Sequence, residues 1–379
     1  MEIKMSFFSV RHDLILLGQP LPYDLYVNSS VLKDKEKFVR VFPEKGILSQ
    51  EDLDQFQKKY FQLYVSELQR GKYLRSLMKA KELNDIEKTN LIKESALKYL
   101  HGIFENKKEF STEILSQNIE GCREVVESMV DVLDQHNIDS LRTLIGNLSF
   151  HDFYTYDHSI NVSMYCITIY KTLNPHASRR ELVHAGLGGL LHDLGKVKVP
   201  THILNKPGGL SDEEYAVIKQ HPELGLELIL SGQCEVNQDI DLKLIARVIS
   251  EHHENFDGTG YPKKLKGKEQ IHLLARICTI ADFFDAITTK RAYSEVLSIA
   301  DAMNTLRKFK GKKLDPDLFD IFDHHVKYLK VEFPRELQLS DKFDPTIPYA
   351  KLPIEEIKQF KKEMDFGKIK VVESGSKKK

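Results

Sequence analysis

Residues 185–200, AGLGGLLHDLGKVKVP, place a histidine and an aspartate inside an otherwise apolar helical segment. The leucines at helical spacing that mark its buried face are Leu187, Leu190, Leu191 and Leu194. Gly195 follows as the expected stop of this helix. An ionised carboxylate among leucines is strongly destabilising unless it is paired or binds a metal. The fold must therefore bring partners to Asp193, and with His192 alone the two would form a hydrogen-bonded structural pair.

Two further histidines are expected at helix ends. His158 opens a predicted helix, and His221 is expected to end the short helix that the capping pair Ser211 and Glu214 begins. Pro222, directly behind His221, predicts a break in the chain there. A single histidine in such a position is more often a hydrogen-bonded core or surface residue than a ligand. Neither residue alone indicates a metal site.

Adjacent histidines and a second pair of carboxylates extend this set. His252 and His253 end an apolar helix, on which neighbouring residues point about 100° apart. One ion can bind both only if the helix ends there, and otherwise two ions are needed. Asp282 and Asp285 stand three residues apart in a helix rich in isoleucine and phenylalanine. Asp282 is thus a second carboxylate in apolar surroundings.

These side chains favour metal-dependent hydrolysis when they are considered together. Imidazole and carboxylate ligands without thiolate suit iron, manganese or zinc. Metal ions with open coordination positions lower the pKa of bound water to about 7, and two such ions roughly 3.5–4 Å apart clamp a phosphodiester during displacement. The cysteines show no C-x-x-C spacing and indicate neither a zinc knuckle nor a disulfide scaffold; they are Cys122, Cys166, Cys234 and Cys278.

The chain of 379 residues is long enough for two or three domains of roughly 150 residues each. Residues 1–137 are predicted to form an N-terminal regulatory module of strands followed by helices, residues 138–335 the catalytic domain, and residues 336–379 a C-terminal tail. The strands are expected at 6–10, 25–28 and 38–42. A helix is expected to follow Ser49 and to include Leu53, Phe56, Tyr60, Tyr64 and Leu68. Further charged helices are expected between residues 85 and 148.

Charge and hydropathy exclude two classes of partner. Lysine and arginine number 55 against 56 aspartates and glutamates, so the net charge of -1 provides no global field for a nucleic acid polymer or an anionic membrane. No run approaches the roughly 20 apolar residues of a membrane-spanning helix, and the first residues lack the apolar region of a signal peptide. We expect no membrane insertion and a cytoplasmic location.

Five stretches of the chain resemble the HD-GYP domain, the bacterial cyclic-di-GMP phosphodiesterase branch of the HD superfamily. They are YTYDHSINV (154–162), HDLGK (192–196), ILNKPGGL (203–210), HHENFDGTGYP (252–262) and ADFFDAITTKRAY (281–293). The resemblance runs from near Asp139 to about Val331, with the motifs in family order. It implies a mainly α protein, in which an all-helical HD-GYP domain adjoins a small strand-containing N-terminal module and connecting helices.

The resemblance also implies a site with two divalent metal ions, iron or manganese, in the core of this domain. One ion would be bound by His158, His192, Asp193 and Asp282, and the other by Asp193, His221, His252 and His253. Asp193 would bridge the ions and, with Lys196, carry the catalysis. Lys196 and Arg291 would hold substrate phosphates, and the signature loop of Gly258, Gly260, Tyr261 and Pro262 would lie beside the substrate.

The activity implied is hydrolysis of cyclic di-GMP to pGpG, and in some relatives onward to GMP, by a hydroxide between the metals. GGDEF-domain proteins are an implied partner through the GYP loop, and a homodimer is left open. The sequence departs from the family at several places: Ser294 replaces a basic residue, Ala292 a proline, and Asn255 with Phe256 a basic and an aromatic residue. Tyr154 replaces a glutamate that helps some relatives bind a third ion, which favours two metals.

Two other functions fit the same residues. A binding or scaffold protein could keep the metals and the loop around Tyr261 with little turnover, as the residues Ser294 and Asn255 suggest. An HD-type phosphohydrolase could instead act on another cyclic dinucleotide or on a nucleotide phosphomonoester, because one fold hosts several activities.

Overall fold

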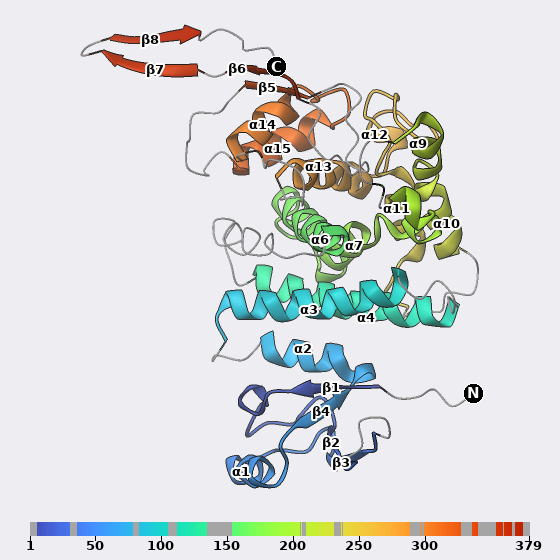
Figure 1. The fold of residues 1–379 in the computed structure, drawn as a ribbon, viewed down its shortest axis with the longest axis vertical. Helices are drawn as coiled ribbons and strands as arrows, with labels where there is room; N and C mark the ends of the chain where they lie inside the picture. The colour runs from blue at the N-terminus through green and yellow to red at the C-terminus, as the bar shows by residue number, and fades with distance from the viewer. Residues whose placement is uncertain are drawn as a thin grey trace.

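The computed structural model describes fifteen stretches of the chain. They are residues 6–30, 36–78, 83–104, 112–134, 154–204, 206, 210–230, 236, 238–288, 297, 299–326, 336–339, 354–358, 360–365 and 368–373. The protein is mainly α-helical, with a small antiparallel sheet at its N-terminal end (Figure 1). The predicted fold class is confirmed. Both predicted domain boundaries, after residues 137 and 335, adjoin segments outside these stretches and stay predictions.

Four antiparallel strands form the N-terminal sheet, in the order β1-β4-β2-β3. They are β1 (Phe7–Val10), β2 (Leu25–Asn28), β3 (Phe38–Phe42) and β4 (Leu63–Ser66). The three predicted strands are therefore confirmed. One face of the sheet is apolar and buried, and on the other the rings of Phe7 and Phe38 stack with centroids 4.1 Å apart.

The helix expected after Ser49 is shorter than its periodicity predicts. Ser49 and Asp52 form the capping box of α1 (Gln50–Lys59), but the chain becomes extended at Tyr60. The expectation that Tyr64 and Leu68 belong to this helix is wrong, because Tyr64 lies in β4, at the centre of the sheet. Pairing with two neighbouring strands outweighs the local helical pattern.

Three helices connect the sheet to the rest of the molecule. They are α2 (Arg70–Met78), α3 (Asp85–Phe104) and α4 (Thr112–Asp134). Figure 1 shows α2 between the sheet and the α3–α4 pair, which lies beneath α6 and α7. The apolar faces of the expected helices are buried and comprise Ile92, Ala96, Leu100 and Ile103 in α3 and Val126, Met129, Val130 and Leu133 in α4.

The helical domain is built around four helices that pack on one another. They are α6 (Tyr154–Leu173), α7 (Arg179–Leu191), α11 (Leu242–Glu251) and α13 (Leu273–Thr288). Shorter elements complete it: η3 (Leu194–Lys198), α8 (Thr201–Leu204), α9 (Asp212–Ile218), α10 (His221–Leu230), α12 (Gly267–Gln270), α14 (Ile299–Arg307) and α15 (Pro316–Val326). Among the described residues, no helix combines the length and the apolar character needed to cross a membrane.

The segment expected as a tail contains two antiparallel strand pairs. β5 (Glu336–Leu339) pairs with β6 (Ile354–Lys358), and β7 (Phe360–Asp365) with β8 (Lys368–Glu373). Figure 1 shows β7 and β8 extending away from the helices. The sequence of this segment does not predict these strands clearly, because its apolar residues occur in short runs separated by many charged residues. The tail thus carries local structure that the sequence interpretation omitted.

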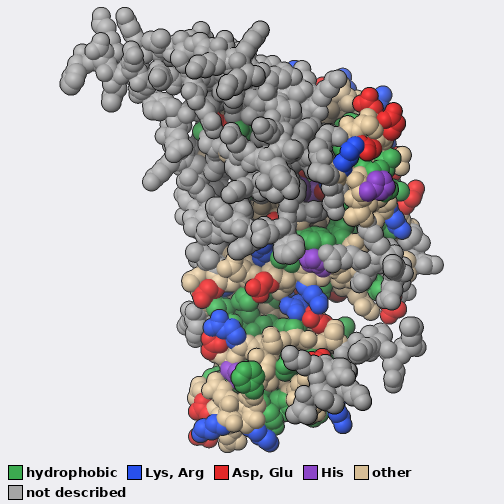
Figure 2. All heavy atoms as spheres, in the orientation of Figure 1, with side chains coloured by type: hydrophobic (Ala, Val, Ile, Leu, Met, Phe, Trp, Pro, Cys, Tyr) green, Lys and Arg blue, Asp and Glu red, His purple; other side chains and the backbone are tan. Residues whose placement is uncertain are grey.

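The described surface carries no large patch of one charge sign on the face shown in Figure 2. Basic and acidic side chains of the described residues alternate there, over the sheet and over the helices alike. Several form exposed pairs, such as Arg11 with Asp13 and Lys310 with Asp320. This distribution agrees with the balanced composition and favours recognition of an anionic ligand at a local site.

Candidate metal centre

The helix that carries the His-Asp pair ends one residue before His192. α7 begins at the capping box of Ser178 and Glu181 and has His192 as its C-cap. The expectation that Gly195 stops this helix is wrong, because Gly195 lies in the following 3₁₀ turn, η3. A Cβ atom on Gly195 would come far inside 3.0 Å of the carbonyl oxygen of His221. Gly195 is thus required where η3 approaches the first turn of α10.

His221 begins a helix, and the expectation that it ends one is wrong. The capping box of Ser211 and Glu214 is present as predicted, but α9 ends at Ile218 and His221 is the first residue of α10. Pro222 lies in the first turn of α10, where its missing N–H costs no hydrogen bond. The break before α10 therefore points the His221 ring toward Asp193.

The adjacent histidines follow the end of α11. The helix ends at Glu251, His252 is its C-cap, and the ring centroids of His252 and His253 lie 4.1 Å apart. Because regular helix geometry stops here, the two rings are not held about 100° apart. This is the condition under which both side chains can face one ion.

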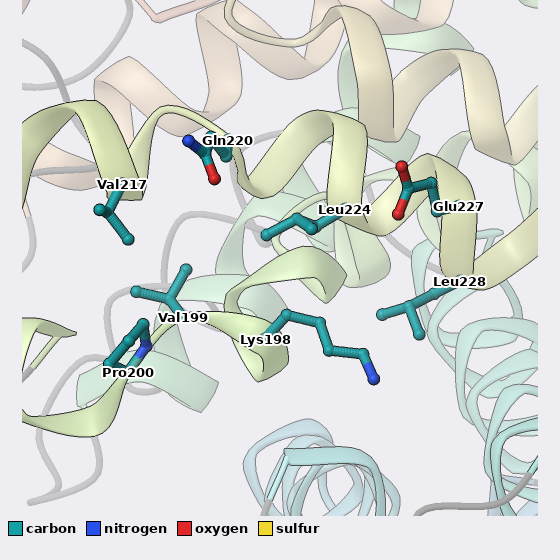
Figure 3. A pocket seen from close by; sticks show the side chains of 8 residues that line it. All are labelled: Lys198, Val199, Pro200, Val217, Gln220, Leu224, Glu227 and Leu228. Carbon is teal, nitrogen blue, oxygen red and sulfur yellow. The ribbon is translucent and has the colours of Figure 1, made fainter.

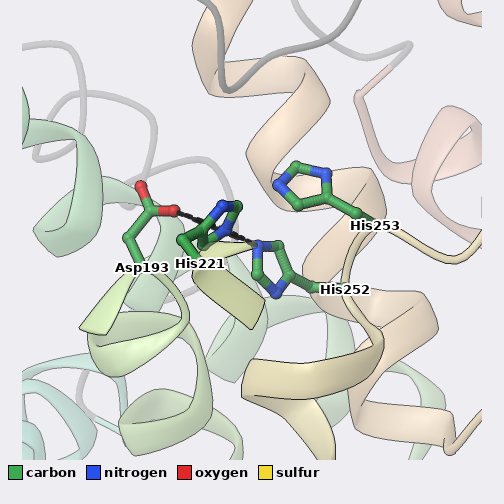
Figure 4. Close-up of side chains that lie close together, drawn as sticks. All are labelled: Asp193, His221, His252 and His253. Atoms are coloured by element: carbon green, nitrogen blue, oxygen red, sulfur yellow. Dashed lines mark hydrogen bonds and ion pairs between the residues drawn. The ribbon is translucent and has the colours of Figure 1, made fainter. Parts of the chain in front are cut away.

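The structure brings the seven predicted ligands together in two buried groups. Within each group, one potential ligand atom per residue lies within 4.8 Å of all the others. One group comprises Asp193, His221, His252 and His253 (Figure 4), and the other comprises His158, His192 and Asp282. All seven side chains are buried.

The carboxylate of Asp193 connects the two groups. Its Oδ1 lies 3.3 Å from His221 Nε2 and 4.0 Å from His252 Nε2. Its Oδ2 lies 3.3 Å from Nε2 of His192, in the other group. A carboxylate with one oxygen facing each group has the geometry of a bridging ligand.

Four of the histidines are oriented through Nδ1. Each Nδ1 lies within hydrogen-bond distance of an oxygen that only accepts, so Nδ1 carries the proton and Nε2 faces the centre of the site. The pairs are His158 with Asp285 Oδ2 (2.7 Å), His192 with Gly189 O (2.7 Å), His221 with Ile218 O (2.9 Å) and His252 with Ile249 O (2.9 Å). This tautomer suits metal binding through Nε2.

Two buried atoms at the centre have no hydrogen-bond partner, namely Nε2 of His192 and Oδ1 of Asp193. Leaving a buried acceptor unsatisfied costs about 1–3 kcal/mol per group. A divalent cation in each group would satisfy these atoms, one ion beside His192 and the other beside Oδ1 of Asp193. The residues present thus fit a metal.

Burial keeps three histidines of the site neutral, namely His221, His252 and His253. It lowers the pKa of His252 to about 4 and lowers the pKa values of His221 and His253 well below the usual 6.5. Nearby histidines lower them further, whereas Asp193 opposes this effect. Neutral imidazole is the form that binds metals.

The two carboxylates remain ionised although they are buried. Burial raises the pKa of Asp193, but His192 and Lys196 outweigh this effect and hold it well below its usual 3.8. The pKa of Asp282 is lowered in the same way by His158. Burial lowers the pKa of His158, but hydrogen bonds to Asp282 and Asp285 raise it to about 9, so an ion bound at this group would displace a proton from Nε2. The site is therefore arranged to hold positive charge.

Lys196 lies inside the site. Its side chain is buried, and Nζ donates to Asp193 Oδ2 at 2.6 Å. The sequence interpretation placed this cation against a substrate phosphate, and the structure places it on the carboxylate between the two groups. Arg291, the other predicted phosphate contact, lies outside the described residues, as do Ala292 and Ser294.

The signature loop lies against the group that contains His253. The ring of Tyr261 stacks on that of His253, with centroids 4.9 Å apart, and its N–H donates to the His253 carbonyl at 3.1 Å. A Cβ atom on Gly260 would clash with the backbone of Asn255, so the close turn requires glycine. A cis peptide bond joins Tyr261 to Pro262.

A buried carboxylate supports this loop from below. Glu254 accepts backbone hydrogen bonds from Lys263 at 2.6 Å and from Leu265 at 2.9 Å. At the tip, Gly258 adopts a φ of 86°, a conformation that favours glycine. The loop thus has a fixed shape next to the metal-binding groups.

The sequence interpretation missed the residues that orient His158. Asp285 accepts from His158 Nδ1 through Oδ2, and its Oδ1 accepts from Asn161 Nδ2 at 2.9 Å. Asp285 had been noted three residues after Asp282 but was given no role. The spacing of Asp282 and Asp285 puts both carboxylates on one helix face, and Asn161 likewise stands three residues after His158. The sequence therefore contained a pattern from which the contact could have been predicted.

A separate cavity of about 550 Å³ is lined by residues from the end of η3, from α9 and from α10 (Figure 3). Its lining is Lys198, Val199, Pro200, Val217, Gln220, Leu224, Glu227 and Leu228. None of these residues is a predicted ligand. The cavity is mixed in character, with apolar walls and one side chain of each charge sign.

Comparisons with known proteins agree with this geometry. A family model described as "HD domain" matches residues 124–318, about half of the chain. The cyclic di-GMP phosphodiesterase PA4108 of Pseudomonas aeruginosa is 41% identical over 198 residues, which are 51% of this chain and 45% of that protein. A 3'3'-cGAMP-specific phosphodiesterase 2 of Vibrio cholerae is 30% identical over 213 residues, 56% of this chain and 39% of that protein. The chain spans less than half the length of these curated relatives.

A solved structure shares the fold. A protein of Bdellovibrio bacteriovorus described as an HDG"Y"P protein superposes with a TM-score of 0.53 at 20% sequence identity. The match covers 85% of this chain and 100% of that chain. At this identity the likeness concerns the fold alone.

Proposed function

The chain belongs to the HD-domain family, and from this premise we propose that it is a metal-dependent phosphodiesterase of the HD-GYP type that hydrolyses cyclic di-GMP to pGpG. The observation that carries the proposal is the pair of buried His/Asp groups joined by Asp193. Relatives named as cyclic di-GMP phosphodiesterases occur in several bacteria, including Xanthomonas campestris and Thermotoga maritima. Further cleavage to GMP is part of the proposal.

The proposed cofactor is a pair of divalent ions, iron or manganese. His158, His192 and Asp282 hold one ion, His221, His252 and His253 hold the other, and Asp193 contributes one oxygen to each. Ions held by these residues would supply a water of lowered pKa as nucleophile and would offset charge on the phosphoryl oxygens. The orphaned atoms of His192 and Asp193 support this assignment.

The protein's own residues bind and orient the substrate. Lys196 holds its ammonium group at the carboxylate that joins the two groups, within reach of a phosphate bound there, where it stabilises charge that develops during displacement. The ring of Tyr261 stacks on the ring of His253, a proposed metal ligand, and bounds one side of the substrate site. Gly260 and Pro262, its neighbours in the chain, form the turn that carries it. Arg291 is proposed as a second phosphate contact.

Another cyclic dinucleotide is the second candidate substrate. The observation that favours it is the similarity to a phosphodiesterase named as specific for 3'3'-cGAMP. Asn255 donates to Thr259 within the loop, so its side chain supports the turn. A phosphomonoesterase or a binding protein with little turnover remains the alternative from another class.

A substrate panel tests the proposal. The protein is purified without oxygen, supplied with Fe²⁺ or Mn²⁺, and incubated separately with cyclic di-GMP, 3'3'-cGAMP and a nucleotide phosphomonoester, and products are identified by mass spectrometry. We expect pGpG from cyclic di-GMP at the highest kcat/KM. Tight binding without any product would favour the binding protein, and a preferred phosphomonoester would contradict the proposal.

Two partner assignments extend the proposal to the surface. Thr259, Lys263 and Lys264 are exposed on the signature loop and are proposed to contact GGDEF-domain proteins. A homodimer is proposed as the solution state. Pull-down with a purified GGDEF domain, with Lys263→Glu as the disrupting variant, and light scattering of the isolated chain test the two assignments separately.

A further inference from the structure

A buried lysine of α3 reaches the first turns of α6. Lys93 is 7% exposed, and its Nζ lies 2.8 Å from Oδ1 of Asp157, which is 4% exposed. α3 ends at Phe104, before residues 124–318 that the family model matches. A residue from outside the matched segment thus forms a buried ion pair with a residue inside it.

Asp157 directly precedes His158 on α6. Adjacent residues of a helix point about 100° apart. When the ion pair holds Asp157 toward α3, the rotation of α6 about its axis is fixed, and the direction in which His158 points is fixed with it. From the other side, Asp282 lies 3.1 Å from His158 Nε2, and Asp285 lies 2.7 Å from Nδ1. The imidazole is therefore fixed by α13, while the backbone that carries it is fixed by α3.

We propose that Lys93 is a positioning residue for the metal centre, whose ion pair with Asp157 holds the first turns of α6 in the rotation that His158 needs to bind its ion. The proposal rests on the metal site of the proposed function. It makes occupancy of the group of His158, His192 and Asp282 depend on the α3–α4 pair, which also packs against α2 and the N-terminal sheet through α2. The group around His221 includes no residue of α6: His221 begins α10, His252 and His253 follow the end of α11, and Asp193 precedes η3.

A purely structural ion pair predicts a different outcome. Removing one partner of a buried pair leaves an uncompensated charge and destabilises the whole fold, which would weaken both metal groups together. Removing both charges relieves that penalty. A double variant therefore distinguishes a loss of fold stability from a change in the position of His158.

Metal stoichiometry and affinity are the measurements. Wild type, Lys93→Met, the double variant Lys93→Met/Asp157→Asn, and Lys98→Met are stripped of metal and titrated with Mn²⁺, and their thermal unfolding is recorded. Lys98 is the matched control, because it lies on the same helix but its side chain is largely exposed. Its Nζ lies 3.7 Å from Oε1 of Glu67, away from the metal centre. It should behave as wild type.

We expect wild type to bind two Mn²⁺ per chain, and the double variant to bind one of them about 10- to 100-fold more weakly, as for other groups that orient metal ligands. The other ion should keep its affinity, and the melting temperature of the double variant should exceed that of Lys93→Met. Two unchanged affinities in the double variant would overturn the inference and leave the proposed function standing. Wild type without bound Mn²⁺ would remove both.

Discussion

The N-terminal sheet and the helical domain bury different kinds of side chain. The buried face of the sheet is apolar, with Leu25, Val27, Leu63 and Val65 almost fully covered. The centre of the helical domain instead buries the seven predicted ligands, all of them ionisable, and two of them leave atoms without a hydrogen-bond partner. Apolar burial stabilises a fold directly, whereas unsatisfied buried polar atoms destabilise it. The comparison indicates that the helical core is arranged for binding a ligand at the expense of stability.

The strongest disruption of the helical centre is expected from its shared carboxylate. Asp193→Ala removes an oxygen from both groups, so both metals should be lost and kcat/KM for cyclic di-GMP should fall by about 10³-fold or more. Elemental analysis alongside the cleavage assay measures this. A variant that keeps both ions would contradict the bridging assignment.

Substitution of Lys196 is expected to impair catalysis without loss of metal. Lys196→Met should keep both ions, because the ammonium group is no ligand, and should lower kcat by about 10²-fold through lost charge stabilisation in the transition state. Steady-state kinetics at saturating Mn²⁺ give the value. A change confined to KM would instead assign Lys196 to ground-state binding.

A smaller effect is expected from the residue that orients His158. Asp285→Asn keeps the shape of the side chain but weakens its hold on Nδ1, and metal affinity at that group should fall about 10- to 100-fold. Thr288→Ser, on the same helix, provides a control, since its hydroxyl donates to the backbone oxygen of Phe284, which is not a ligand. Equal loss of affinity in both groups would argue against a local role.

The sheet supplies the opposite test. Leu63→Ala should destabilise the protein by about 2–5 kcal/mol, because it leaves a cavity in the apolar core. The intrinsic metal affinities of folded protein should not change. Chemical denaturation and Mn²⁺ titration of the same sample measure the two quantities, and a selective loss of metal would show that the two regions are coupled more widely than through Lys93.

The sequence revealed the chemistry of the site better than its geometry. His192 and Asp193 stand out because charges in an apolar helix need partners, and the resemblance to the HD-GYP motifs implies the other five ligands. By contrast, the role of Gly195 depends on a distant backbone, and the position of His221 at the start of a helix depends on where α9 ends. Such features arise from tertiary packing, which local periodicity does not contain.

The same limit applies to the rest of the fold. β4 was expected as helix because Tyr60 and Tyr64 have helical spacing, and only pairing with β1 and β2 determines its extended form. The contact of Lys93 with Asp157 joins residues far apart in the chain and leaves no pattern in either segment. Its discovery required the packed structure.

The two-metal assignment is tested most directly by a crystal structure of protein loaded with Mn²⁺, recorded with anomalous scattering. We expect two peaks roughly 3.5–4 Å apart, one among His158, His192 and Asp282 and one among His221, His252 and His253, with Asp193 between them. If crystals saturated with Mn²⁺ showed no peak among these side chains, the two-metal assignment would be contradicted.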